Sequence, residues 1–288
     1  MDKPFYKEHK KFIDNFIHSA LEEDIGKIDY SSESCIPTNS FKSAKLFVKK
    51  PCVIAGVELA EKIFKYFDPK IIFKKLMNDG EVAKFGSIPF TVDGKAKSIL
   101  ATERVVLNTM QRMSGISTIT KSFRNKIIGF DCKILDTRKT SPNFRYPEKW
   151  AVKIGGGENH RMGLFDSIII KDNHIDYCGG INKTLIKVEK YLKQLKSKKP
   201  ILIVETRNLG EIKDVLKYDF VDRILLDNMS ISMLKMAIKI INKKIKVEVS
   251  GNISSSNIQK IAETGVDYMS IGALTHSAPH IDLSLKAI

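Results

Sequence analysis

The second half of the chain repeats one pattern that restricts its fold more than any other feature. Four short apolar runs each end at a polar residue or a glycine, and these end positions lie 22, 23 and 22 residues apart. An amphipathic stretch separates each run from the next, so strand and helix alternate along the chain. Parallel strands joined by right-handed crossovers satisfy such a pattern. The four runs are ILIVE, ILLD, VEVS and YMSIG.

Two further apolar runs upstream, CKILD and SIIIK, raise the expected number of strands to about six. We therefore predict an α/β barrel that is shorter than the usual eight units. The period also falls within the range of leucine-rich repeats, but the leucine and asparagine ladder of that repeat is missing.

The first part of the chain has a different pattern, which predicts a small α+β domain over residues 1–105. Residues 6–22 carry apolar residues at helical spacing, and a long amphipathic helix is expected from about Glu103 to Lys126. No glycine-rich linker follows, so we expect this domain to pack against a barrel domain of residues 106–288. VELAEKIFKYF predicts another helix, and the strand candidates are AKLFVKK, CVIAG, KIIFKKL, GSIPFTV and KSILATE.

The composition of the chain indicates which kinds of molecule it binds and in which cellular compartment it is found. A net charge of +15 is compatible with a nucleic-acid-binding protein. Many of the lysines, however, fall at expected helix ends and turns, where solvated lysine is common. The four cysteines are far apart in the sequence and indicate free thiols in a reducing cytoplasm. With no membrane-length apolar run and no signal-like start, we expect a cytoplasmic protein that binds neither nucleic acid nor a membrane.

The strand ends of the predicted barrel are chemically unusual. In such barrels the carboxyl ends of the strands carry the functional site. Glu205 and Asp227 are hard oxygen ligands on neighbouring strands, suited to a Mg²⁺ ion that also holds substrate phosphates. Small-residue turns follow the last two strands, where backbone N–H groups commonly bind phosphate. The six ends are Asp136, Lys171, Glu205, Asp227, Ser250 and Gly272.

The upstream strands are followed by cations. The segment KIGGGENHRMG places three glycines before His160 and Arg161. It is either a surface turn or an anion site, in which glycine lets the backbone and a cation approach a charged ligand. Arg138, Lys139 and Lys171 add further charge, so a matching ligand is phosphorylated and carboxylated. With no Ser-His-Asp order and no nucleophilic cysteine, we expect electrostatic catalysis.

Several motifs, in order along nearly the whole chain, resemble the quinolinate phosphoribosyltransferase family. They include ERVVLNTMQRMSGIST, DTRKTSPNFR, GGGENHRMG and GVDYMSIGALTHSAP. The resemblance implies an N-terminal open-faced α/β sandwich plus an incomplete α/β barrel. It also implies Mg²⁺-assisted, decarboxylating transfer from 5-phosphoribosyl 1-diphosphate to quinolinate, giving nicotinate mononucleotide for NAD biosynthesis. The family forms homodimers in which one sandwich covers the partner's barrel mouth, and a hexamer is left open.

The same resemblance assigns roles to residues. Arg104 resembles an arginine that enters the neighbouring subunit's site, while Glu205 and Asp227 resemble carboxylates near the ribose and Mg²⁺. Lys139, Lys171, Glu205 and Asp227 are the expected catalytic residues. The expected quinolinate-binding residues are Arg104, Arg138, Lys139, His160, Arg161 and Lys171. The expected phosphoribosyl diphosphate-binding residues are Glu205, Asp227, Ser250, Gly251, Asn252, Gly272 and His276.

The chain departs from the family pattern at three positions. Ile203 stands where many relatives have the first glutamate of Glu-x-Glu, which leaves Glu205 alone to serve. Asn143 replaces a frequent glycine and is expected to adopt left-handed backbone geometry. Ile28 interrupts the usual Gly-Asp turn before Ser31, so that loop departs from the family pattern.

Two other functions stay open at this point. One is a phosphoribosyltransferase of the same fold that acts on a different ring acid. The other is a basic nucleic-acid-binding protein, which needs cations and aromatic residues spread over an exterior face. The distinctive cations lie instead at strand ends, and Trp150 falls in a helical pattern that predicts a core position.

Overall fold

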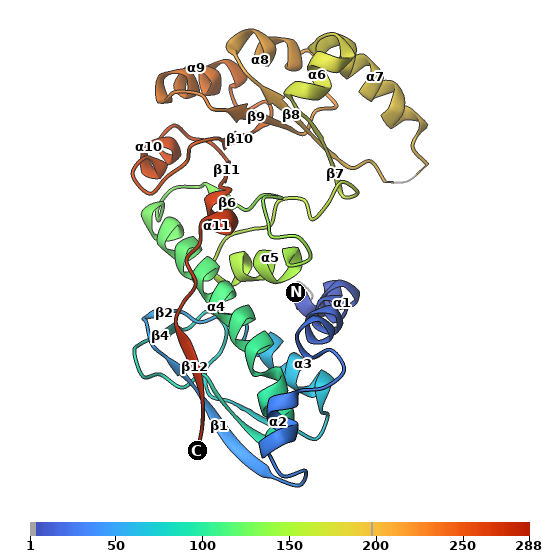
Figure 1. The fold of residues 1–288 in the computed structure, drawn as a ribbon. Helices are drawn as coiled ribbons and strands as arrows, with labels where there is room; N and C mark the ends of the chain where they lie inside the picture. The colour runs from blue at the N-terminus through green and yellow to red at the C-terminus, as the bar shows by residue number, and fades with distance from the viewer. Residues whose placement is uncertain (1–3, 197) are drawn as a thin grey trace. The chain divides into compact units, whose positions relative to one another are not determined.

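The computed structural model of the protein describes residues 4–196 and 198–288 and forms two compact units (Figure 1). The first unit contains the chain up to Ser122 together with Lys139–Gly157 and Ala273–Ile288. The second unit contains Phe123–Arg138 and Glu158–Gly272. The predicted domain boundary between residues 105 and 106 lies within a helix, and it stays a prediction.

The first unit is built on an antiparallel sheet with the strand order β12-β1-β5-β3. The last strand of the chain was not predicted. Leu46 of β1 pairs with Leu285 of β12, and Figure 1 shows the two strands side by side (blue and red). A separate pair joins β2 to β4. The strands are β1 (Phe41–Val48), β2 (Cys52–Val53), β3 (Ile72–Lys75), β4 (Val82–Ala83), β5 (Phe90–Lys95) and β12 (Leu283–Ala287).

The helices of the first unit correct one sequence expectation. Residues 97–103, KSILATE, were expected to form a strand but belong to the first turns of α4. A short apolar run does not by itself distinguish a strand from a buried helix segment, and here the helical pattern downstream extends back to Ala96. The helices are α1 (Phe5–Ile25), α2 (Tyr30–Cys35), α3 (Val57–Phe67), α4 (Ala96–Lys126), α5 (Arg145–Ile154) and α11 (Ala273–His276). The last residues of α4, from Phe123, belong to the second unit.

The glycine run that follows α5 has a structural explanation. A Cβ atom on Gly155 would lie 2.6 Å from the carbonyl oxygen of Ser117, so only glycine permits this approach of α5 to α4. Gly156 has a φ of +87°, which side chains rarely adopt. Trp150 of α5 is buried against Phe5, with ring centroids 5.5 Å apart, which confirms its predicted core position.

The second unit contains six parallel strands in the order β6-β11-β10-β9-β8-β7. All six strands expected from the sequence are present. β6 and β7 stand at opposite ends of this order, which is the arrangement of an incomplete barrel. The strands are β6 (Lys133–Leu135), β7 (Ser167–Ile170), β8 (Ile201–Thr206), β9 (Arg223–Asp227), β10 (Lys246–Ser250) and β11 (Tyr268–Ser270).

Five helices accompany these strands in the second unit. Two of them have side-chain N-caps. The Asn208 side chain accepts from the Glu211 amide at the start of α8, and the Ser230 side chain accepts from the Met233 amide at the start of α9. No helix in residues 4–196 or 198–288 is both long and apolar enough to cross a bilayer. The helices are α6 (Asp172–Cys178), α7 (Ile181–Gln194), α8 (Leu209–Val215), α9 (Ile231–Ile241) and α10 (Ile258–Ala262).

Strand alternation explains how this sheet presents polar groups at one end. Ile169, Ile203 and Leu225 form a buried cluster on three adjacent strands. Side chains two residues apart point to the same face of a sheet. The residue two positions after each cluster member therefore points to the same face of the sheet, at the carboxyl end of its strand. The apolar Ile203 thus has a packing role, and the polar positions that follow the cluster are Lys171, Glu205 and Asp227.

Candidate functional site

Two guanidinium groups lie close together in the second unit. Burial, and then the neighbouring positive charge of Arg138, lower the pKa of Arg161 from its ordinary value. Arginine nevertheless stays charged, because its ordinary pKa is above 12. Arg161 Nη1 donates to the Ser167 carbonyl at 3.0 Å, while its buried Nε has no hydrogen-bond partner among the described residues. Two guanidinium groups held this close favour an anionic ligand with planar acceptor groups.

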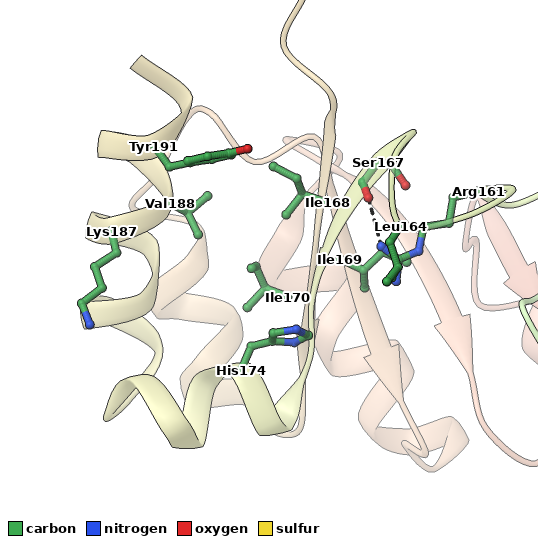
Figure 2. A pocket seen from close by; sticks show the side chains of 10 residues that line it. All are labelled: Arg161, Leu164, Ser167, Ile168, Ile169, Ile170, His174, Lys187, Val188 and Tyr191. Atoms are coloured by element: carbon green, nitrogen blue, oxygen red, sulfur yellow. Dashed lines mark hydrogen bonds between the residues drawn. The ribbon is translucent and has the colours of Figure 1, made fainter. Parts of the chain in front are cut away.

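A pocket of about 390 Å³ adjoins this arginine (Figure 2). Its walls are β7, with Ser167 and Ile170, and α7, with Tyr191. Figure 2 shows the Arg161 side chain at one side of the pocket, hydrogen-bonded to Ser167. Its lining is largely apolar, with Arg161, His174 and Lys187 as its basic members. Ile168 and Ile170 place most of this pocket on the α7 side of β7, whereas Ile169 and Lys171 point to the other face.

The two candidate metal ligands also lie close together. Glu205 is buried at the end of β8, and Asp227 ends the neighbouring β9. Burial, and then repulsion from Asp227, raise the pKa of Glu205, although the nearby Lys171 ammonium lowers it. A cation held by both carboxylates would offset this repulsion, so the donor set fits Mg²⁺. No group of three or more His, Cys, Asp or Glu side chains suited to a metal occurs among the described residues, so the other ligands would be substrate phosphates and water.

A tight turn follows β10 beside Asp227. The Ser250 hydroxyl donates to Asp227 Oδ1 at 2.7 Å, and the Asn228 amide donates to the Ser250 carbonyl at 3.0 Å. Gly251 and Asn252 have φ values of +87° and +50°, and a Cβ on Gly251 would clash with the Asn228 side chain. The turn therefore requires glycine at this position, which agrees with the predicted small-residue turn.

The sequence-predicted residues fall into both units. In the second unit, Arg138 lies near Arg161, and Glu205 lies near both Lys171 and Asp227. Asp227 in turn holds Ser250. Gly272 ends the second unit, and His160 contacts the buried Glu248 in the same unit. Arg104, Lys139 and His276 belong to the first unit.

The structure gives Asp136 and Asn143 defined roles. Asp136 is buried and accepts from the backbone N–H of His160 at 2.9 Å, so it anchors the segment before Arg161. Asn143 has a φ of +59°, which confirms the expected left-handed geometry. Ile28 is exposed, and the Asp29 side chain caps α2 by accepting from the Ser32 amide.

An ion pair that the sequence did not predict connects distant segments of the first unit. Arg112 Nε and Nη2 donate to the buried Glu148 carboxylate at 3.0 and 2.9 Å. Arg112 also donates to the carbonyls of Thr275 and Ala278, while Glu148 accepts from the Ser141 amide. The signal was a cation among apolar residues in MQRMSG, where a buried charge needs a partner.

We expect Glu148→Gln to lower the free energy of unfolding by about 3 kcal/mol, because it leaves the Arg112 charge buried and unpaired. Urea titration measures this change. Glu158→Gln is the matched control, since the Glu158 side chain is 50% exposed and its partner Lys133 54%. That exposed pair contributes less than about 1 kcal/mol. Equal losses in the two variants would contradict the assigned importance of the buried pair.

Comparison with known proteins identifies the family. Residues 29–114 match the N-terminal domain of quinolinate phosphoribosyl transferase, and residues 116–286 match its C-terminal domain. The chain belongs to the quinolinate phosphoribosyltransferase family. It is 45% identical over 285 residues to the tobacco (Nicotiana tabacum) protein named quinolinate phosphoribosyltransferase [decarboxylating] 1b, which covers 94% of this chain and 81% of that protein.

Further family members support the assignment from sequence and from structure. A protein of Synechocystis named probable nicotinate-nucleotide pyrophosphorylase [carboxylating] is 36% identical to this chain. The aligned region covers 96% of this chain and 92% of the Synechocystis protein. The solved nicotinate-nucleotide pyrophosphorylase of Francisella tularensis has a TM-score of 0.88 at 34% identity, covering 100% of this chain and 98% of that one. The predicted fold class, a sandwich plus an incomplete barrel, is therefore confirmed.

Proposed function

We infer that the chain catalyses decarboxylating phosphoribosyl transfer, a pentosyltransferase reaction of NAD biosynthesis. Quinolinate and 5-phosphoribosyl 1-diphosphate are converted into nicotinate mononucleotide, diphosphate and carbon dioxide. The observation that carries this inference is the pair of neighbouring guanidinium groups of Arg138 and Arg161, in a member of this family. An aromatic diacid matches the charge of such a pair and its planar donor groups.

Each functional group has a proposed task in binding. Arg138 and Arg161 bind quinolinate carboxylates, and Lys139 and Lys171 complete that set, with Arg104 supplied by the partner of a homodimer. The exposure of Arg104 on α4 supports this last assignment. His160 supports the set by accepting the Arg161 amide. The turn after β10 and the segment that ends at His276 bind the phosphoribosyl donor, through Ser250, Gly251, Asn252, Gly272 and His276.

The electrostatic arrangement supports the chemistry of transfer. As diphosphate leaves C1 of the ribose, the carbon becomes cationic, and the carboxylates of Glu205 and Asp227 stabilise that charge. The positive charges of Lys139 and Lys171 stabilise the departing diphosphate. Mg²⁺ held by Glu205, Asp227 and substrate phosphates would neutralise further charge on the leaving group. The four free cysteines support a cytoplasmic location for this reaction.

Decarboxylation follows from the new bond. The pyridine nitrogen attacks C1 and becomes positively charged when the bond forms. The ring then stabilises the electron pair left at C2 when the 2-carboxylate departs as carbon dioxide, and that carbon takes up a proton. Arg138 and Arg161 hold the ring in place through these steps, with their charge matched to the carboxylates.

We expect carbon dioxide to be released from quinolinate only when both Mg²⁺ and 5-phosphoribosyl 1-diphosphate are present, because the positive ring nitrogen exists only after transfer. Release of labelled carbon dioxide from carboxyl-labelled quinolinate measures this dependence. Nicotinate, which lacks the 2-carboxylate, is the comparison substrate. Equal turnover of nicotinate would favour a related phosphoribosyltransferase that acts on a different ring acid.

A further inference from the structure

A glutamate lies at the centre of β10 where an apolar strand residue is normally found. Glu248 is fully buried, yet Arg223 Nη1 donates to its Oε2 at 2.8 Å and the Ser270 hydroxyl donates to its Oε1. His160 Nε2 lies 3.1 Å from the same Oε1. Burial alone would raise the pKa of Glu248, but the hydrogen bonds from His160, Ser270 and Arg223 hold that pKa below its ordinary value. Glu248 is therefore a buried carboxylate with a charged partner.

The contacts of His160 fix its tautomer. Its Nδ1 accepts the backbone N–H of Arg161 at 2.7 Å, so that nitrogen carries no proton. The ring proton then lies on Nε2, which faces Glu248. Since Arg223 already balances the charge of Glu248, a neutral imidazole completes the cluster without leaving a net buried charge.

The ring connects β10 to the backbone of the candidate anion site. The amide that His160 Nδ1 accepts belongs to Arg161, whose guanidinium is bound to β7 through the Ser167 carbonyl. Asp136, which directly follows β6, accepts from the preceding amide, that of His160, at 2.9 Å. The His160 side chain is only 8% exposed, and both ring nitrogens contact the protein. These contacts hold the segment that carries Arg161 from β10, from β7 and from the residue that follows β6.

We propose that Glu248 is a positioning residue of the quinolinate site, which acts through the neutral His160 ring to fix Arg161. His160 contributes to the site by the same positioning. The proposal rests on the proposed function, because it takes quinolinate as the ligand of Arg161. The sequence signal was the lone carboxylate inside the apolar run VEVS.

Binding of quinolinate to the whole protein tests the proposal first. Glu248→Gln keeps the shape of the side chain but replaces one carboxylate oxygen with an amide NH₂ group. That group cannot accept a hydrogen bond, so either Arg223 or His160 faces another donor. We expect the Kd for quinolinate to rise about 10- to 100-fold. The Kd for 5-phosphoribosyl 1-diphosphate should change by less than about twofold, as for independent sites. Ser270→Ala is the matched control, since it removes a neighbouring hydrogen bond of Glu248 but leaves the His160 contact in place.

A double-mutant cycle distinguishes positioning from general damage to the barrel. If Glu248 acts through Arg161, adding Glu248→Gln to Arg161→Met should raise the Kd by less than about a further twofold. The same large factor in both backgrounds, or an equal loss of donor affinity, would overturn the proposal. If Glu248→Gln does not fold, His160→Phe takes its place in the same cycle, and additive effects would again overturn it.

Proton NMR tests the Glu248–His160 contact without any ligand. We expect a downfield imidazole N–H resonance in the unaltered protein and in Ser270→Ala, because the buried hydrogen bond protects that proton from exchange with water. It should be absent in His160→Phe and shifted upfield in Glu248→Gln. Absence of this resonance from the unaltered protein overturns the proposal. Failure of that protein to bind quinolinate while the resonance is present would instead overturn the proposed function.

Discussion

Arg161→Lys is expected to lower kcat/KM for quinolinate by about 100-fold, because lysine keeps the charge but loses the planar pair of donors that a carboxylate accepts. The change also removes the Nη1 hydrogen bond that ties this side chain to the Ser167 carbonyl. Steady-state carbon dioxide release with varied quinolinate measures the effect. Thermal unfolding and donor affinity report separately on whether the fold is intact.

Arg207→Lys provides the matched control for Arg161→Lys. Arg207 makes exposed ion pairs with Asp176 and Glu211, which lysine can replace. We expect kcat/KM to change by less than about twofold in this control. Normal turnover of quinolinate by Arg161→Lys would mean that His160 and Arg161 are structural residues and that the anion site lies elsewhere.

Arg104→Ala and Lys171→Ala are each expected to be nearly inactive alone and to recover activity when mixed. Arg104 is exposed on α4 in the first unit, and Lys171 lies near Glu205 in the second. In the proposed homodimer each site takes Arg104 from one chain and Lys171 from the other. A mixed dimer then has one intact site and one doubly altered site. A random mixture should approach roughly a quarter of the original activity, since half the dimers are mixed and half of their sites are intact.

The complementation experiment needs proof that subunits exchange. Differently tagged chains, mixed and analysed by native mass spectrometry, measure the fraction of mixed dimers. Each variant incubated with a tagged copy of itself should stay inactive. Full exchange without recovered activity would show that Arg104 does not act in the partner's site, and would leave it as a surface residue or a ligand within its own chain.

The barrel strands could be predicted because their signals are local. Short apolar runs that end at a polar residue or a glycine are properties of neighbouring positions, so they placed all six strands of the second unit. The same strand ends put Glu205 and Asp227 at the carboxyl ends of adjacent strands. Asn143 and Gly251 were readable for a similar reason, since left-handed backbone geometry restricts which residues can occupy a turn.

Elements and partners set by distant contacts could not be read from the sequence. Residues 97–103 are apolar enough to form a strand, but they are helical because they continue directly into the rest of α4. β12 exists because residues 283–287 pair with β1, which is more than two hundred positions away in the chain. The segment alternates apolar and polar residues, but it is only five residues long, and its hydrogen bonds depend on the edge that the rest of the sheet offers.

The sequence by itself determined the six-stranded pattern, the polar strand ends and the family resemblance, all of which depend on residue order. The tertiary structure alone decided which charges meet. It paired Arg112 with Glu148 in the first unit, and in the second it placed Glu248 against both Arg223 and His160. A buried charge needs a partner, but a sequence does not specify which one, because the choice depends on the distances that folding creates.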